Sequence, residues 1–392
     1  MLSSILNSLP KLRLSPRLGA MVRLGWHMMA GNKLKTAGTV FGVIFATILA
    51  NQQLGIFFGL LYKNTMFVQQ AGADIWITPP NTNIFQPGQI LPRDILFKAK
   101  ALAEIEWAEP LVLGAGSLSR PDGGTEGVSL VGTANPQFAG GPWNIVAGRR
   151  EDLLRPGAIF IEDGERKKYG FANLGDIREL NKKRVVISGF TWGLTPFAPA
   201  YGFATIETAR NILRLGPDDY HFVLIKLKNP ADADRVRNIL ASHRSDFTIM
   251  TKSEFVQRTV NYLIKNTGIG ASFATSTTFA LLIGLIVVSL SMFSSVIDNI
   301  REFGTLKAIG ATNTNLALLL VIQALIFGVA GSIIGLAIVS RIAAGIRSAA
   351  LALVLPPWLT LGTIPVMVVM CLLSSLLALA RIRKIEPGMV FR

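Results

Sequence analysis

Residues 36–62 read TAGTVFGVIFATILANQQLGIFFGLLY, an apolar run without a charged residue. Three further apolar runs lie at residues 277–297, 316–340 and 361–380, and the mixed polar segment 63–267 separates them from the first. Each run is close to the ~20 residues that a helix needs to cross ~30 Å of hydrocarbon. The pattern predicts a membrane protein of four transmembrane α-helices, with one large α+β extracytoplasmic domain between the first and second helices.

The charges indicate which ends of the spans face the cytoplasm. Only 16% of the residues are charged, against about 25% in typical soluble chains. Twelve cations and three acids flank the spans on one side: Lys11, Arg13, Arg17, Arg23, Lys33, Lys35, Arg301, Lys307, Arg381, Arg383, Lys384 and Arg392 against Asp298, Glu302 and Glu386. The positive-inside rule places both termini and the 298–315 connector in the cytoplasm. A nucleic-acid footprint is disfavoured, because these cations form no single patch with interleaved aromatic residues.

The first span is expected to be a retained anchor. It is too long for the apolar region of a secretory signal, and Ile48 stands where a small residue would precede cleavage after Ala50. The single cysteine, Cys371, lies in the fourth span, so no intrachain disulfide is expected. The predicted order is a basic arm with an amphipathic helix (1–35), span (36–62), outer domain (63–267), stalk and span (268–297), connector (298–315), span (316–340), outer loop (341–360), span (361–380) and cytoplasmic tail (381–392).

The outer domain combines β-rich runs with amphipathic helices that do not alternate strictly, which favours an α+β fold. Strands are predicted at residues 74–78, 127–133, 158–161, 184–190, 221–228 and 247–250. Helices are predicted at residues 91–106, at 231–243 after the N-cap Asn229, and at 255–264 after a Thr251/Glu254 capping box. The last helix is expected to continue towards the second span, with Gly268 and Gly270 able to bend it.

Three loops rich in Gly and Pro, at residues 79–92, 120–127 and 189–202, are either connectors or partner contacts. A split of the domain into subdomains near Pro110 and Pro217 is a further possibility.

The motifs of common enzymes are missing. The sequence has no G-x-x-x-x-G-K-[ST] phosphate loop, so the chain is not expected to hydrolyse ATP. It also lacks H-E-x-x-H, C-x-x-C and G-x-S-x-G. The three histidines, His27, His221 and His243, make a poor metal site without cysteines nearby. We therefore predict a non-catalytic chain without a cofactor or metal of its own.

Polar and small residues inside the spans predict helix packing. Asn51, Gln52 and Gln53 interrupt the first span and Gln323 lies in the third, where an unpaired amide in hydrocarbon is costly. Interhelical contact is the favoured interpretation of these residues, and substrate contact the alternative. Gly328, Gly331 and Gly335 form a small-residue face on the third span that predicts close approach of a neighbouring helix.

The connector carries both apolar and charged residues. Ile297, Ile300 and Phe303 recur at helical spacing, so the second span is expected to extend as a helix into the cytoplasm. Gly304 and Gly310 permit a bend and a return into the third span. Such a turn is typical either of an element that docks into a socket on a soluble partner or of a solvated loop. The helical spacing of the apolar residues does not distinguish these two interpretations.

The run 301–311, REFGTLKAIGA, closely resembles the signature of FtsX/MacB-type permeases of ABC transporters. The resemblance extends over nearly the whole layout, and the ending 380–391, ARIRKIEPGMVF, is similar to the close of that family. Residues 251–255, TKSEF, and 266–270, NTGIG, resemble the DevC subgroup of exporter permeases. Because residues 1–35 are too short for an ATPase, the chain departs from MacB itself, which carries one.

The resemblance implies a permease subunit of an export or efflux complex in the bacterial inner membrane. It implies a homodimer, two copies of a separate ABC ATPase that binds ATP and Mg, a periplasmic adaptor and a TolC-like outer-membrane channel. The implied ATPase-coupling residues are Asp298, Ile300, Arg301, Glu302, Phe303, Gly304, Thr305, Leu306, Lys307, Ala308, Ile309, Gly310 and Ala311.

Two alternatives remain open. The first is an FtsX/Lol-like mechanotransmitter that regulates a cell-wall hydrolase or extracts lipoproteins, and it shares every membrane feature. The second is a membrane-anchored receptor or scaffold without an ATPase.

Overall fold

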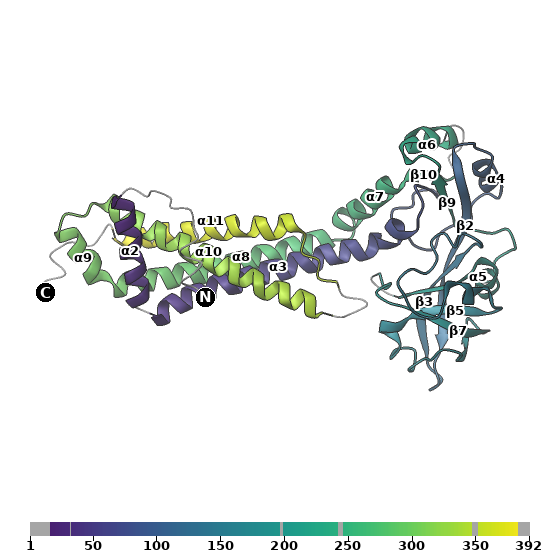
Figure 1. The fold of residues 1–392 in the computed structure, drawn as a ribbon, viewed down its shortest axis with the longest axis horizontal. Helices are drawn as coiled ribbons and strands as arrows, with labels where there is room; N and C mark the ends of the chain where they lie inside the picture. Colours follow the sequence, from purple (N-terminus) through teal and green to yellow (C-terminus); the bar gives the residue numbers. More distant parts are fainter. Residues whose placement is uncertain (1–15, 32, 197–198, 242–245, 347–351, 383–392) are drawn as a thin grey trace. The chain divides into compact units, whose positions relative to one another are not determined.

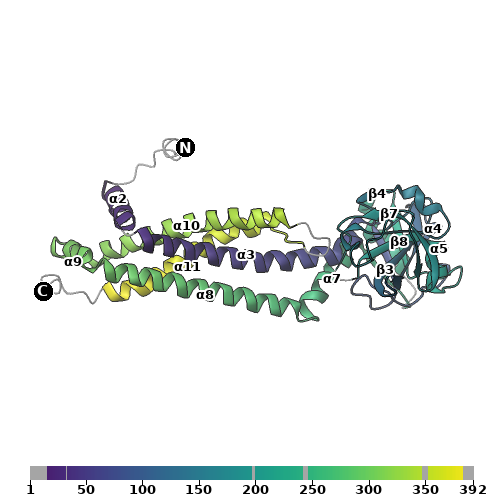
Figure 2. The same cartoon turned by 90° about the horizontal axis from the view of Figure 1, so that it is seen from below.

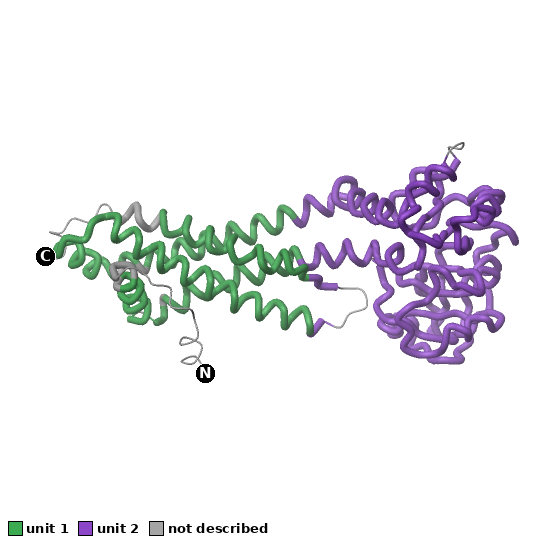
Figure 3. Tube along the Cα trace, turned by 45° about the horizontal axis from the view of Figure 1, so that its top comes forward, with its two compact units in different colours: residues 1–54, 274–344, 355–392 green, residues 55–273, 345–354 purple. Residues whose placement is uncertain are grey.

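The computed structural model describes residues 16–31, 33–196, 199–241, 246–346 and 352–382. Several residues used above lie outside the described ones, namely Lys11, Arg13, His243, Arg383, Lys384, Glu386 and Arg392. The chain divides into two compact units, coloured separately in Figure 3: unit 1 comprises residues 1–54, 274–344 and 355–392, and unit 2 comprises residues 55–273 and 345–354.

Helices build unit 1. They are α2 (Pro16–Gly31), α3 (Lys33–Gln70), α8 (Ile269–Asp298), α9 (Ile300–Ala308), α10 (Asn313–Gly345) and α11 (Pro357–Ile382). Of these, α3 and α8 continue from unit 1 into unit 2. Four of them are long and apolar enough to cross a membrane, over Thr36–Gln70, Ile269–Ser294, Asn313–Gly345 and Pro357–Leu376. The prediction of four spans is therefore confirmed. The first helix is longer than predicted, because the charge at Lys63 does not break a helix and the first left-handed glycine is Gly72, at φ +78°.

The four long helices run alongside one another in both Figure 1 and Figure 2, with α2 and α9 at the same end of this bundle. One apolar core joins all of them. It contains Val43 of α3, Val288 of α8, Leu320 of α10 and Met367 of α11, and Phe303 of α9 belongs to it as well. The short helix α9 is thus part of the packed bundle.

Over its described residues, unit 2 is organised around one mixed sheet of ten strands. The strands are β1 (Ile75–Thr78), β2 (Ile105–Ser119), β3 (Thr125–Thr133), β4 (Ile145–Ala147), β5 (Ala158–Glu162), β6 (Ile177–Leu180), β7 (Lys183–Thr191), β8 (Tyr201–Thr205), β9 (Phe222–Leu227) and β10 (Thr248–Thr251). Their order is β10-β1-β9-β2-β3-β8-β5-β7-β4, with β6 pairing β2 and β7. The β3–β8 and β5–β7 pairs are parallel and the other pairs are antiparallel.

The sheet separates two apolar cores, because successive side chains of a strand point to opposite faces. In β1, Ile75 and Ile77 join the core beneath α4 (Asp94–Lys100), α5 (Ile206–Leu213) and α6 (Ala233–Ala241). Trp76, between them, joins the opposite core, which holds Phe67 of α3 and Phe255 of α7 (Lys252–Lys265). Unit 2 therefore consists of helices, sheet and helices in three layers.

An aromatic cluster fixes the last turns of α3 on the sheet. The Phe67 ring stacks on Phe85 with centroids 4.0 Å apart and meets Trp143 and Tyr201 at 5.6 and 5.1 Å. Phe67 is fully buried, which contributes about 1.5–3 kcal/mol. Phe85 belongs to the predicted 79–92 loop and packs in this core. Part of that loop therefore has a structural role.

Most predicted elements of the domain are present, and the differences have physical causes. All six predicted strands exist, and Thr251 and Glu254 form the predicted capping box. The predicted helix 91–106 is wrong beyond Lys100, because β2 begins at Ile105 and pairs with β9 and β3 along its length. Pro110 does not divide the domain, since β2 runs through it.

The predicted continuation of α7 towards the second span is broken at Gly268, one of the two glycines expected to bend it. The helix ends at Lys265, and Gly268 adopts φ +71° before α8 begins at Ile269. That left-handed conformation is open to glycine and ends regular helix.

Candidate functional site

The connector forms a separate helix, α9, between α8 and α10. Asn299, at φ −92° and ψ 20°, interrupts the backbone after α8, so the predicted continuous extension of the second span is wrong. Gly304 lies buried in the middle of α9 and introduces no bend. The return is made at Gly310, whose φ of +105° suits glycine.

Hydrogen bonds close both ends of this turn. The Ala311 N–H donates to the Leu306 carbonyl at 2.9 Å, which caps α9. The Asn315 N–H donates to Thr312 Oγ1 at 3.3 Å, which starts α10. The connector is therefore a defined structural element.

The two faces of α9 have different partners. Phe303 is 2% exposed in the bundle core, and Ile300 and Leu306 pack beside it. The opposite face is exposed, and Ile309 at its end is 81% exposed. Of the predicted coupling residues, Gly304 is also buried, Lys307 and Ala311 are half-buried, and the exposed ones are Arg301, Glu302, Thr305, Ala308, Ile309 and Gly310. Asp298 is the last residue of α8. Phe303 thus holds α9 in place, and only the charged outer face is accessible.

Glycines bring the membrane-capable helices into contact. A Cβ added to Gly331 would lie 2.6 Å from Val43 Cβ of α3, and one added to Gly335 would lie 2.7 Å from Thr47 Cβ of the same helix. A Cβ added to Gly328 would lie 2.9 Å from Val368 Cα of α11. These distances require glycine. The sequence reasoning missed Gly284 of α8, where a Cβ would lie 2.4 Å from Ala46 Cβ of α3. Gly284 has no second glycine four residues away, so the spacing rule gave no signal.

Polar contacts also join the helices. Thr363 Oγ1 of α11 donates to Asn51 Oδ1 at 3.1 Å, and Asn51 Nδ2 donates to the Thr47 carbonyl at 2.8 Å. The Ser289 hydroxyl of α8 donates to that of Ser374 in α11 at 3.0 Å. Gln323 is buried, whereas Gln53 is half-buried and Gln52 is exposed. The three neighbouring amides of α3 therefore have different surroundings.

A buried polar link connects the outer part of α3 to the sheet within unit 2. Lys63 Nζ donates to the Gly193 carbonyl at 2.6 Å. The N–H of the same Gly193 donates to Glu162 Oε1 of β5 at 2.5 Å. Gly193 has φ +81°, so glycine is favoured at the residue whose carbonyl and N–H the two charged side chains hold. Sequence reasoning missed this link, because Lys63 and Glu162 are far apart in the chain and only the fold brings them together.

Glu162 is fully buried and well supplied with donors. Its Oε2 accepts from the Leu194 N–H at 2.9 Å and from Thr191 Oγ1 at 3.2 Å. Burial raises the pKa of Glu162, and these hydrogen bonds act in the opposite direction. Part of the 189–202 loop is therefore a structural connector held from two sides.

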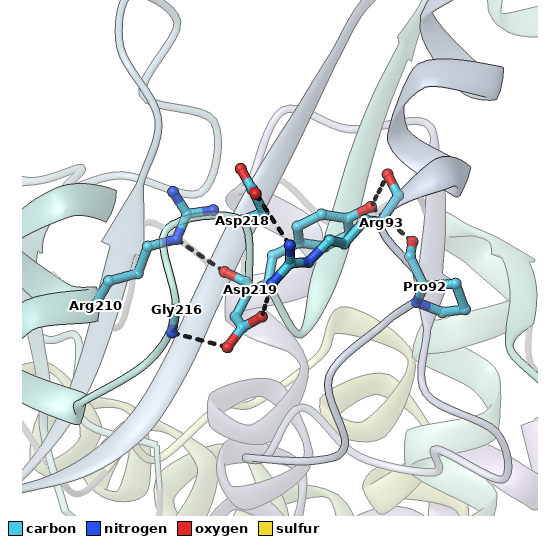
Figure 4. A network of polar contacts seen from close by, with 7 residues as sticks. Pro92, Arg93, Arg210, Gly216, Asp218 and Asp219 are labelled. Carbon is cyan, nitrogen blue, oxygen red and sulfur yellow. Dashed lines mark hydrogen bonds and ion pairs between the residues drawn. The ribbon is translucent and has the colours of Figure 1, made fainter.

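A second polar network, drawn in Figure 4, fixes the turn before β9. Asp219 accepts from Gly216 N–H at 2.8 Å and pairs with Arg93 at 3.4 Å, while Arg210 Nε donates to the Asp219 carbonyl at 2.8 Å. Tyr220 Oη donates to the Pro92 carbonyl at 2.8 Å. The segment around Pro217 is thus tied to α4 and α5 and does not separate two subdomains.

His221 and the acids do not gather as metal ligands. His221 Nδ1 accepts from the Leu113 N–H at 3.2 Å, and burial lowers the pKa of His221, with Asp219 opposing this shift. Among the described residues, no group of three or more His, Cys, Asp or Glu side chains could hold a metal ion.

Comparisons with known proteins match both parts of the chain. Residues 274–387 match the FtsX-like permease C-terminal family and residues 36–242 the MacB-like periplasmic core domain family. An uncharacterized ABC transporter permease of Methanocaldococcus jannaschii is 27% identical over 124 residues, which are 30% of this chain and 30% of that relative.

Two solved structures resemble the domain at low identity. The periplasmic region of MacB from Actinobacillus actinomycetemcomitans is 15% identical, with a TM-score of 0.36 over 50% of this chain and 95% of that one. The extracellular domain of the ABC-type transporter YknZ from Gram-positive bacteria is 12% identical, with a TM-score of 0.34 over 45% of this chain and 98% of that one.

Proposed function

This chain belongs to the FtsX/MacB family of ABC transporter permeases, and we propose that it is the transmembrane subunit of an export or efflux complex driven by a separate ATPase. The observation that carries the proposal is α9. Its apolar face is locked into the bundle by Phe303, and its charged outer face is accessible to a soluble partner. A force applied to that face reaches the membrane helices directly, because interiors packed like α9 and the bundle deform little.

The α3 helix supports a path for the motion. It is continuous from Lys33 to Gln70, passes Val43 in the bundle core, and ends in the Lys63 link and the Phe67 cluster. In the proposal, ATP binding draws two ATPases together, and the displacement passes along α3 and α8 to the outer domain. The domain then drives a substrate outward.

The proposed assembly follows from this role. Two copies of the chain pair with two ATPase subunits, which bind ATP and Mg. The complex lies in the bacterial inner membrane with both termini and α9 in the cytoplasm and residues 63–267 in the periplasm. A periplasmic adaptor and an outer-membrane channel receive the substrate.

Co-purification with a co-expressed ABC ATPase subunit tests the proposal. Arg301→Ala, Glu302→Ala and Ile309→Ala remove exposed groups from α9. Each is expected to weaken ATPase binding about 30-fold if it is a hot spot worth ~2 kcal/mol. Arg341→Ala, an exposed cation at the other end of α10, is the matched control and should bind normally. Wild-type binding by all three α9 variants would contradict the proposal.

Labelling tests the orientation independently. Cys371 is buried and is the only cysteine, so Glu302→Cys in a Cys371→Ser background supplies one accessible thiol. A membrane-impermeant maleimide should label it in inverted membrane vesicles and leave it unlabelled in intact cells. Labelling in intact cells would place α9 outside and rule out an ATPase partner there.

A further inference from the structure

A cavity of about 640 Å³ lies in unit 2 between the β2–β3 pair, the turn that joins β6 to β7 and the end of α5, and its volume is within the range of small-molecule sites. Its apolar side chains are Ile212, which is 2% exposed, and the half-buried Leu213. The hydroxyls of Ser117, Ser119 and Thr125 add neutral hydrogen-bonding groups. Because Ser117 and Thr125 are exposed, the cavity is open to the surface.

Two cations line this cavity, Lys182 of the β6–β7 turn and Arg214 at the end of α5, and both are exposed. Neither forms an ion pair with a described residue. Among the described lining residues the acid is Glu179, which lies opposite Arg184 in the pairing of β6 with β7. Lys182 and Arg214 against Glu179 give these lining residues a net charge of +1, and both cations are available to a ligand.

Both cations have a backbone conformation that is unfavourable for a residue with a side chain. Lys182 has φ +65° and Arg214 has φ +58°. This left-handed region brings Cβ too close to the backbone, so residues other than glycine, asparagine and aspartate seldom adopt it. Among the described non-glycine residues with positive φ, Lys182 and Arg214 are the two that carry a charge. Both line the same cavity.

Local preferences favour glycine at each of these two positions. Asn181 and Lys182 form a two-residue hairpin loop closed by the Leu180–Lys183 pair, and Asn-Gly is the preferred sequence of such a loop. Arg214 ends α5 in the left-handed conformation, where glycine is the commonest residue. The stability of the turn and of the helix end therefore does not account for the cations. A side chain that contradicts the preference of its own backbone indicates a functional role.

The walls around the two cations are fixed to β2. Asn181 Oδ1 accepts from the Ser117 N–H at 2.9 Å, and Asn181 Nδ2 donates to the Ala115 carbonyl at 3.2 Å. On the other side, Leu213 packs on Gly114, where an added Cβ would lie 2.6 Å from Leu213 Cδ1. A ligand would thus enter a shaped site without first ordering its walls.

We propose that this cavity binds a small organic anion, whose carboxylate or phosphate is held by Lys182 and Arg214 and whose apolar part packs against the last residues of α5. Ammonium and guanidinium groups form strong, charge-assisted hydrogen bonds to such anions. Ser119 Oγ already accepts from the Glu179 N–H at 2.9 Å, so its own proton is available to the ligand. This site goes beyond the proposed export function and does not depend on it.

Calorimetric titration of the full chain in lipid nanodiscs, without an ATPase, tests the site. Phenyl phosphate and phenylacetate supply an anion with an apolar ring, inorganic phosphate the anion alone, and benzyl alcohol the ring without charge. We expect saturable binding of the aromatic anions, weaker binding of inorganic phosphate and none of benzyl alcohol, and the tighter aromatic anion identifies phosphate or carboxylate as the preferred group. Added salt should weaken binding, because the cations are exposed. No saturable binding of either aromatic anion, or equal binding of benzyl alcohol, would overturn the proposal.

Glycine variants separate binding from folding. Lys182→Gly and Arg214→Gly each remove a cation and suit the left-handed backbone, so each should weaken binding of the preferred anion about tenfold while the Tm stays the same or rises. Lys182→Arg keeps the charge and should bind like wild type, as should the matched control Lys252→Ala, which removes an exposed cation outside the lining. Wild-type affinity in both glycine variants would overturn the proposal. A lower Tm in both would overturn it as well, because folding would then explain the cations.

Discussion

The Lys63–Gly193–Glu162 link gives the sharpest prediction about stability. Glu162→Gln keeps the side-chain volume, but its Nε2 cannot accept a hydrogen bond. At least one of the three groups that donate to this carboxylate, the N–H of Gly193 and Leu194 and the hydroxyl of Thr191, loses its partner. A buried donor without a partner costs about 1–3 kcal/mol.

Lys63→Met should cost less. It removes one charge-assisted hydrogen bond to the Gly193 carbonyl, worth about 1.5–3 kcal/mol, and it relieves the desolvation of a buried cation. For a domain of this size, 1–3 kcal/mol from Glu162→Gln corresponds to a Tm decrease of about 2–12 °C. We expect a smaller decrease for Lys63→Met.

The assay is thermal unfolding of the purified full chain in detergent, followed by tryptophan fluorescence. The double variant Lys63→Met/Glu162→Gln should be less destabilised than the sum of the single variants, with a coupling of about 0.5–3 kcal/mol. Lys183→Met and Glu179→Gln are exposed, matched controls that should shift Tm little. Strict additivity, or a Lys63→Met shift no larger than that of Lys183→Met, would refute the reasoning.

Two further predictions concern helix packing and pH. Gly331→Ala places a Cβ 2.6 Å from Val43 Cβ and should destabilise the chain by about 1–3 kcal/mol, whereas Gly38→Ala meets nothing within 4 Å and should be neutral or stabilising by up to ~1 kcal/mol; thermal unfolding in detergent compares them, and equal effects would contradict close packing at Gly331. Burial lowers the pKa of His221 in the folded chain. When the pH falls below ~6.5, the unfolded chain therefore binds a proton at this residue that the folded chain does not bind. The free energy of unfolding then decreases until the pH passes the pKa of His221 in the folded chain. His221→Gln should remove this pH dependence, which unfolding between pH 7 and 5 measures, and an unchanged slope would show that another group is responsible.

The membrane layout could be predicted from the sequence because hydrocarbon thickness fixes the length of an apolar helix. The same holds for Thr251 and Glu254, whose capping box is a contact between neighbours in the chain. The six predicted strands were recognisable from their apolar residues and the turn residues at their ends. The long strand β2 was not, since Pro110, Gly114 and Gly116 are unfavourable in strands and pairing with β3, β9 and β6 stabilises it.

The candidate sites divide in the same way. Residue type and spacing alone marked residues 298–311 as a connector of interest, and marked Gly328, Gly331 and Gly335 as a packing face. Which side of α9 is accessible depended on the bundle core that buries Phe303, and the tie between Lys63 and Glu162 depended on a loop that returns to α3. Local sequence determines helices, caps and spans because their interactions join residues a few positions apart. Tertiary structure alone decides which side chains meet across long separations, since those contacts form only when the sheet and the helices pack.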